Sequence, residues 1–220
     1  MTPEERKQNS ENILRKKGVS VSTHLPCFMP ASDIKLKSTD DICRRAVAAL
    51  LTTQAAIMLD EGDTKQADFF IGLMEHFGVK DCLNQVEKRI VGKNCSKQDL
   101  TDIVWEYECF WALAWVLGLI DDITDAENIC DCKKAINLVS QCESLDDFKN
   151  RCKLRSAEEI LDMFDLYSRY DWSFFRKKHI PNTTTGNIDG EVVYERRRAL
   201  IWVISDAKDW YDIQLEPSEE

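Results

Sequence analysis

The chain has 220 residues, of which 44% are hydrophobic and 31% charged, with 8 Gly and 5 Pro. This composition excludes collagen-like, low-complexity and disordered proteins, and it favours helix. The 29 Lys and Arg against 39 Asp and Glu give a formal net charge of −10. A chain with this charge repels a phosphate backbone unless its basic residues gather on one face, so we do not expect nucleic acid as a partner.

The first part of the chain predicts one helix followed by an irregular stretch. Residues 3–17 have the pattern of an amphipathic helix that Thr2 caps and Gly18 ends. Residues 19–37 alternate apolar and polar side chains on either side of two prolines. This pattern is typical of a short two-stranded β-ribbon or of an extended arm, and it leaves both open.

The middle of the chain predicts buried helices. A capping box that begins at Ser96 opens the most apolar segment, which ends at Ile120 and carries three of the six Trp. From Cys109 this segment is apolar on every face, as expected for a helix inside a bundle. The apolar run from Cys109 to Ile120 is twelve residues long, whereas a helix that spans a bilayer needs about 20. We therefore expect no transmembrane segment and no membrane as a partner. Helical periodicity before this segment covers 40–62, 64–77 and 80–91.

The second half continues as helix. A second capping box, Ser156 to Glu159, opens a long predicted helix over 157–179, and Asp189 can cap the last major helix. Shorter helices are predicted over 131–139 and 145–152.

Together these elements predict an all-α, single-domain, multi-helix bundle over residues 1–220. Neither an internal repeat nor a long linker divides the chain. The expected division is an N-terminal helix and arm (1–39), a helical core (40–215) and a polar tail (216–220).

Cysteine usage and the N-terminal sequence favour a reduced, cytoplasmic protein. Residues 1–17 are polar and lack the apolar stretch of a secretory signal. Nine cysteines cannot all pair within the chain, and the one close pair, Cys130 and Cys132, lacks CxxC spacing. None of the three histidines stands in ligand spacing. We therefore expect neither a metal nor a cofactor.

Two charged motifs resemble binding sites. Asp121, Asp122 and Asp125 spell DDxxD, the pattern with which helical isoprenoid synthases hold magnesium and diphosphate. Here the motif follows Gly118, where the helix ends, and no second acidic motif follows it, so we interpret it as a solvated acidic turn. The basic cluster Glu195 to Arg198 has acidic neighbours and does not predict a nucleic-acid surface.

More informative are two charges that stand where apolar residues are expected. Glu108 lies at helical spacing from Trp105 and Trp111, and Arg196 shares a stripe with Val192 and Ala199. Burying either charge alone would be costly, so each predicts either a structural ion pair or a polar pocket. The candidate pocket, floored by tryptophans, consists of Glu108, Trp172, Arg196, Trp202 and Asp212.

Several stretches of the chain, spread over nearly its whole length, match a known family. They are Arg6 to Pro26, Glu108 to Ile120, Cys130-Asp131, Leu154 to Leu161, Tyr170 to Trp172, Tyr194 to Trp202 and Asp209 to Asp212. On these stretches the chain resembles the uncharacterised family known as domain of unknown function 4272. At Ile201 the family usually has Asn, and at Asp171 it often has His, which argues against an essential role for either family residue. The resemblance implies a mostly helical intracellular domain and no particular activity.

Three hypotheses about function follow, of which one is a housekeeping scaffold without a pocket. The first is a non-enzymatic interaction protein, of the immunity or antitoxin kind, whose acidic surface binds a protein partner with a basic surface. The alternative is an enzyme or small-ligand binder that uses the polar pocket around Glu108 and Arg196. The sequence names neither substrate, partner nor oligomeric state.

Overall fold

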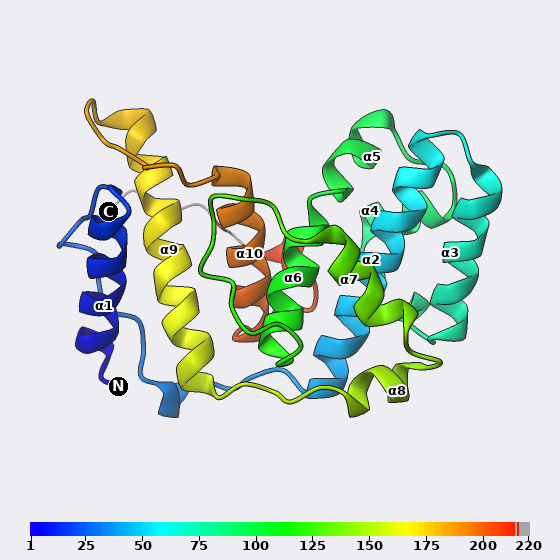
Figure 1. Ribbon diagram of the computed structural model, residues 1–220, viewed down its shortest axis with the longest axis horizontal. Helices are drawn as coiled ribbons and strands as arrows, with labels where there is room; N and C mark the ends of the chain where they lie inside the picture. The colour runs from blue at the N-terminus through cyan, green and yellow to red at the C-terminus, as the bar shows by residue number, and fades with distance from the viewer. Residues whose placement is uncertain (214, 216–220) are drawn as a thin grey trace. The chain divides into compact units, whose positions relative to one another are not determined.

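The computed structural model describes residues 1–213 and 215, and this part of the chain is all-α (Figure 1). Its one β feature is an isolated antiparallel bridge between Val19 and Thr185. The predicted all-α class is confirmed. The predicted polar tail over 216–220 lies outside the described residues, and the single-domain division stays a prediction.

Two units emerge from the backbone contacts. Unit 1 consists of residues 1–37, 124–129 and the described residues from 155 onward, and unit 2 consists of 38–123 and 130–154. Unit 1 contains α1 (Pro3–Lys16), η1 (Ala31–Asp33), α9 (Ala157–His179), α10 (Gly190–Val203) and η3 (Trp210–Asp212). Unit 2 contains α2 (Thr39–Asp60), α3 (Thr64–His76), η2 (Lys80–Cys82), α4 (Gln85–Val91), α5 (Lys97–Ile103), α6 (Glu106–Val116), α7 (Cys132–Ser140) and α8 (Leu145–Asn150).

Helix α2 is the centre of unit 2. The Ser38 hydroxyl accepts a hydrogen bond from the Asp41 N–H and starts the helix. Most side chains from Ile42 to Ala56 are buried, and several are alanines, which let other helices approach closely. Helices α3 to α8 all pack against α2. The length and composition of α2 would also suffice for a bilayer span, which the sequence does not predict. Of its most apolar 18-residue stretch, however, 78% is buried inside the protein.

The apolar segment that follows Ser96 is divided into two helices. The Ser96 capping box starts α5, which ends at Ile103, and α6 begins at Glu106. The Thr53 hydroxyl of α2 donates a 3.2 Å hydrogen bond to the Ile103 carbonyl at this break. Every side chain of α6 is buried, as expected for a segment that is apolar on every face from Cys109 onward.

In unit 1, α9 packs against both α1 and α10. Of the two alternatives for residues 19–37, the structure has the extended arm. The ends of the arm bond elsewhere in unit 1, because Val19 bridges to Thr185 and the Lys37 N–H donates to the Val203 carbonyl at 2.9 Å. A ribbon would have needed these groups to pair within the arm.

Buried arginines hold the arm in place. Arg169 binds Asp165 through two hydrogen bonds of 2.8 Å and donates a third, of 3.2 Å, to the Pro26 carbonyl. Arg6 forms a 2.7 Å ion pair with Asp162. Because both arginines are almost completely buried, they act as structural links between α1, α9 and the arm.

Candidate functional site

Glu108 is an interior carboxylate of unit 2. It lies in α6, is 2% exposed, and accepts a 2.6 Å hydrogen bond from the Cys130 N–H. Burial, together with the negative charge of Glu108, raises the pKa of the Cys130 thiol, which therefore stays protonated at neutral pH. Cys130 is accordingly a structural thiol and a poor nucleophile.

Arg196 is an interior cation of unit 1. It lies in α10, is 2% exposed, and donates to the Tyr167 hydroxyl at 3.0 Å and to the Asn128 carbonyl at 3.4 Å. It also donates to the Asp125 carbonyl. Arg196 thus fastens the segment 124–129 to α9 and α10. Its predicted pairing with Glu108 joins residues of two units and stays a prediction.

Trp202 has partners of its own in unit 1. Its ring packs edge-on against Trp210, with centroids 6.2 Å apart, and the ammonium group of Lys37 lies 4.7 Å from its centroid. Its indole N–H donates to the Lys208 carbonyl at 3.3 Å. The ring therefore belongs to a packed cluster that joins the end of the arm to the end of α10.

The two other predicted site residues lie nearer the surface. Trp172 is half-buried in α9, and the guanidinium group of Arg176 stacks 4.9 Å from its ring centroid. Asp212 is exposed in η3. The predicted residues of unit 1 thus have different immediate neighbours, and the five-residue pocket stays a prediction.

The basic cluster of α10 is used within the chain. Arg197 forms a 3.0 Å ion pair with Asp171, and Arg198 forms a 2.9 Å pair with Glu195 while lying over the ring of Tyr211. Burial lowers the pKa of Arg197 and raises that of Asp171, although the two opposite charges partly offset this effect. These guanidinium groups are therefore committed to intrachain partners.

The acidic motif is exposed and non-helical, and its interpretation as a solvated turn stays a prediction. Asp121, Asp122 and Asp125 are exposed and lie outside the helices. Asp125 accepts a 2.9 Å hydrogen bond from the Glu127 N–H and one of 3.1 Å from the Asn128 amide, and the former does most to lower its pKa. Among residues 1–213 and 215, no group of three or more His, Cys, Asp or Glu side chains could hold a metal ion.

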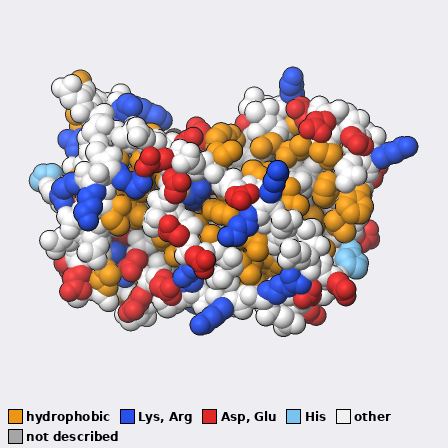
Figure 2. Space-filling model, in the orientation of Figure 1, with side chains coloured by type: hydrophobic (Ala, Val, Ile, Leu, Met, Phe, Trp, Pro, Cys, Tyr) orange, Lys and Arg blue, Asp and Glu red, His pale blue; other side chains and the backbone are white. Residues whose placement is uncertain are grey.

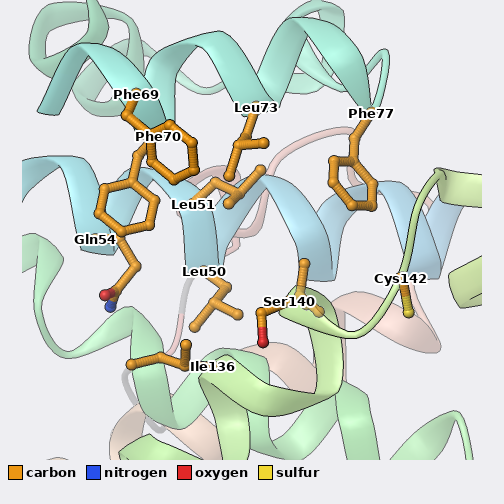
Figure 3. Close-up of a pocket in the computed structure, with 11 residues that line it drawn as sticks. Leu50, Leu51, Gln54, Phe69, Phe70, Leu73, Phe77, Ile136, Ser140 and Cys142 are labelled. Atoms are coloured by element: carbon orange, nitrogen blue, oxygen red, sulfur yellow. The ribbon is translucent and has the colours of Figure 1, made fainter. Parts of the chain in front are cut away.

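A pocket that the sequence analysis did not predict lies in unit 2, among α2, α3 and α7 (Figure 3). Its volume is about 200 Å³. The space-filling view shows apolar side chains gathered over α3 (Figure 2), where Phe69 is 55% exposed. The pocket is lined by Leu50, Leu51, Gln54, Phe69, Phe70, Leu73, Phe77, Ile136, Val139, Ser140 and Cys142.

Gln54 is the main polar group of the lining. Its amide Nε2 donates to the Tyr107 hydroxyl. Burial raises the pKa of Tyr107 to about 12, so this hydroxyl stays protonated at neutral pH. The amide oxygen Oε1 accepts no hydrogen bond from the described part of the chain, which leaves an acceptor in a mostly apolar lining whose other polar members are Ser140 and Cys142.

Some of the residues that line this pocket follow a regular spacing in the sequence. Phe69 and Leu73 on α3 and Phe77 directly after it recur every four residues, and Ile136 and Ser140 do the same on α7. Such stripes are typical of any helix face that packs against a core. The sequence does not indicate that the two faces leave a space between them, because that depends on tertiary packing.

Comparison with known proteins identifies a family. No curated protein and no solved structure shows significant similarity to the chain. The family model described as domain of unknown function DUF4272 matches residues 6–213. This match covers nearly the whole chain, as the sequence resemblance predicted, and the protein belongs to the DUF4272 family.

Proposed function

We propose that the protein is a non-enzymatic binding protein whose unit 2 pocket takes a small aromatic molecule with one hydrogen-bond donor, such as a phenol. The observation that carries this proposal is the lining, which combines three phenylalanine rings and five aliphatic side chains with the free acceptor of Gln54. Pockets of this kind bind through apolar contact and gain selectivity from a few polar groups.

The volume supports a ligand with one or two rings. A cavity of about 150 Å³ lined by apolar side chains can hold benzene. The pocket here is somewhat larger, at about 200 Å³, but smaller than those that hold drug-sized ligands. Burying roughly 150–200 Å² of ring surface contributes about 4–5 kcal/mol, and the cost of ordering the ligand is subtracted from this, so we expect a Kd of about 1 mM or weaker.

The acceptor of Gln54 supports selectivity for a donor-bearing ring. A phenol hydroxyl that reaches Oε1 would keep a hydrogen bond when it leaves water, whereas toluene has no such group. A net hydrogen bond contributes about 0.5–1.5 kcal/mol, so phenol should bind roughly 2- to 13-fold more tightly than its hydrophobicity alone gives.

The lining also favours binding over catalysis. Its polar members are an amide, a hydroxyl and the Cys142 thiol. Burial raises the pKa of Cys142, so this thiol is protonated at neutral pH and is a weak nucleophile. General acid–base chemistry needs a group that titrates near the working pH, and these three side chains do not supply one.

The proposal is tested by titrating the purified chain with phenol and with toluene while following the thermal unfolding temperature. Both ligands should raise it saturably. Leu73→Trp, which fills the pocket from α3, should abolish both effects. Gln54→Leu should weaken the binding of phenol to the affinity that its hydrophobicity alone gives, and it should leave the binding of toluene unchanged.

A matched control separates pocket filling from a general effect of tryptophan. Val104 is also a partly exposed apolar residue of unit 2, but it does not line the pocket. Val104→Trp should therefore leave both titrations unchanged. Ligand effects that persist in a folded Leu73→Trp variant, or that never saturate, would contradict the proposal.

A protein partner with a basic surface is the second candidate. Five arginines and six acidic side chains are buried among the described residues, so most of the excess negative charge of that part of the chain lies on half-buried or exposed side chains. The face in Figure 2 carries acidic and basic side chains side by side. Salt screens attraction between charges, so a partner that is held by charge should dissociate as the ionic strength rises. A protein that purifies with the chain from its native cell at low salt should therefore be lost from the complex at high salt. Retention of that partner independent of salt would oppose the charge-based interaction.

A further inference from the structure

Two cysteines far apart in the sequence meet inside unit 2. Cys43 lies in α2 and is completely buried, whereas Cys152 follows α8 and is half-buried. Their sulfur atoms are 3.7 Å apart, and both are free thiols. A disulfide bond measures about 2.05 Å, so the two sulfurs would have to approach by about 1.6 Å to form one.

The surrounding contacts hold the two segments together. Lys149 of α8 forms a 2.6 Å ion pair with Asp40 of α2, three residues before Cys43. Phe148 is fully buried, and its carbonyl accepts a 3.2 Å hydrogen bond from the Cys152 thiol. Because the ion pair connects α8 to α2 and the hydrogen bond holds Cys152 against the end of α8, the short sulfur–sulfur distance belongs to the folded unit.

The environments of the two thiols differ. Cys43 donates a hydrogen bond to the Cys152 sulfur, and this bond lowers the pKa of Cys152 while it raises that of Cys43. The ammonium group of Lys149 favours the thiolate of Cys43 and the carboxylate of Asp40 opposes it. Cys152 is therefore both the more acidic and the more accessible thiol of the pair.

We propose that Cys152 is a peroxide-reactive thiol and that Cys43 resolves its oxidised form into a disulfide. The oxidant is a hydroperoxide. The Cys152 thiolate attacks its terminal oxygen, an S–O bond forms and the O–O bond breaks. The leaving alkoxide takes a proton, so that an alcohol departs, or water in the case of hydrogen peroxide.

In the second step, Cys43 and Cys152 form a disulfide that links α2 to the residues after α8. The Cys43 sulfur attacks the sulfenic sulfur of Cys152, the S–S bond forms and the S–O bond breaks. The hydroxyl group leaves as water with the proton from Cys43. In total, two thiols lose two electrons and two protons, and one hydroperoxide is reduced to an alcohol and water.

The test exposes the reduced full-length chain to a stoichiometric amount of hydrogen peroxide and maps its thiols by mass spectrometry. The expected product has lost two of its nine free thiols, and peptides that contain Cys43 and Cys152 are joined. Dithiothreitol should restore both thiols. Unchanged thiols, or a link between another pair, would overturn the proposal.

Variants separate the two roles. Cys43→Ala should stop the reaction at a sulfenic acid on Cys152, which dimedone traps, whereas Cys152→Ser should leave Cys43 unreacted. Cys109→Ser changes another buried thiol, which does not line the pocket, and should still form the link. If Cys43→Ala fails to fold, as judged by circular dichroism, the Cys152→Ser variant and the rate at which Cys152 is alkylated still decide. Cys152 should react faster than Cys142 and Cys43, and a slower reaction would contradict the proposal.

Discussion

The buried carboxylate of Glu108 accepts a 2.6 Å hydrogen bond from the backbone N–H of Cys130, which connects α6 to the residues just before α7. Glu108→Gln keeps an acceptor for this N–H and removes the charge. If Arg196 balances that charge, as the sequence predicts, Glu108→Gln and Arg196→Met should each lower the free energy of unfolding by about 3–5 kcal/mol.

The double variant decides whether the two charges interact. Coupled residues should lose less in combination than the sum of the single losses, measured by urea unfolding. Additive losses below about 1 kcal/mol each would show that the two side chains do not form a buried pair.

Adjacent arginines of α2 offer a comparison between a buried and an exposed ion pair. Arg45 pairs with Glu87, and the two side chains are 5% and 0% exposed, whereas Arg44 pairs with Asp81, which is 76% exposed. Burial alone would lower the pKa of Arg45, but the charges of Glu87 and Glu106 more than offset it and raise the pKa.

Charge removal should therefore have unequal effects at these two sites. Glu87→Gln should lower the free energy of unfolding by about 3–5 kcal/mol because it removes the carboxylate that pairs directly with a buried guanidinium. Asp81→Asn should cost about 1 kcal/mol or less. Similar losses in urea unfolding would mean that burial does not set the strength of these pairs.

Asp99 predicts a dependence of stability on pH. Hydrogen bonds from Arg89 and from the Ser96 N–H lower the pKa of this carboxyl. Above about pH 4 the carboxyl is charged in both states and these contacts stabilise the folded state. As the pH falls below that value, the unfolded state takes up the proton first, so this contribution is lost.

Asp99→Asn should therefore be less stable than the natural chain at pH 7, and the difference should shrink towards pH 3. Asp102→Asn is the matched control. Asp102 lies in the same helix as Asp99, but it accepts its 2.7 Å hydrogen bond from the neutral amide of Gln98 and not from an arginine. A gap between Asp99→Asn and the natural chain that is equal at both pH values would contradict the linkage.

Gly118 combines a left-handed backbone with a close neighbour. Its φ is +72°, and a Cβ atom there would lie 2.5 Å from the Lys153 carbonyl oxygen. Gly62 has a φ of +81° but open space around the same position. Gly62→Ala should cost about 1–2 kcal/mol through its backbone conformation alone. Gly118→Ala should cost more in thermal or urea unfolding, and equal losses would show that Lys153 moves away freely.

Local signals in the sequence predicted most of the helices. The capping box of Ser156 and Glu159 places the start of α9 at Ala157, and Asp189 caps α10. The sequence does not predict the break before α6. At this break the Ile103 carbonyl accepts its hydrogen bond from Thr53, 50 residues earlier in the chain, and such a contact leaves no local signal in the sequence.

The pocket and the thiol pair could not be predicted for the same reason. Phe69 and Ile136 lie on separate helices, and each has the pattern of an ordinary core stripe. Cys43 and Cys152 stand 109 positions apart with no motif around either. Only the packing of α3, α7 and α8 against α2 brings these side chains together.

The most direct test of the proposed binding site is a phenol titration of methyl-labelled protein by nuclear magnetic resonance. The methyl signals of Leu50, Leu73 and Ile136 should shift together and saturate with a single Kd, because the three side chains line one pocket. The signals of methyl groups outside the pocket, such as those of Val104 and Ile129, should keep their chemical shifts. Absent shifts, or shifts spread over the surface without saturation, would contradict a ligand site between α2, α3 and α7.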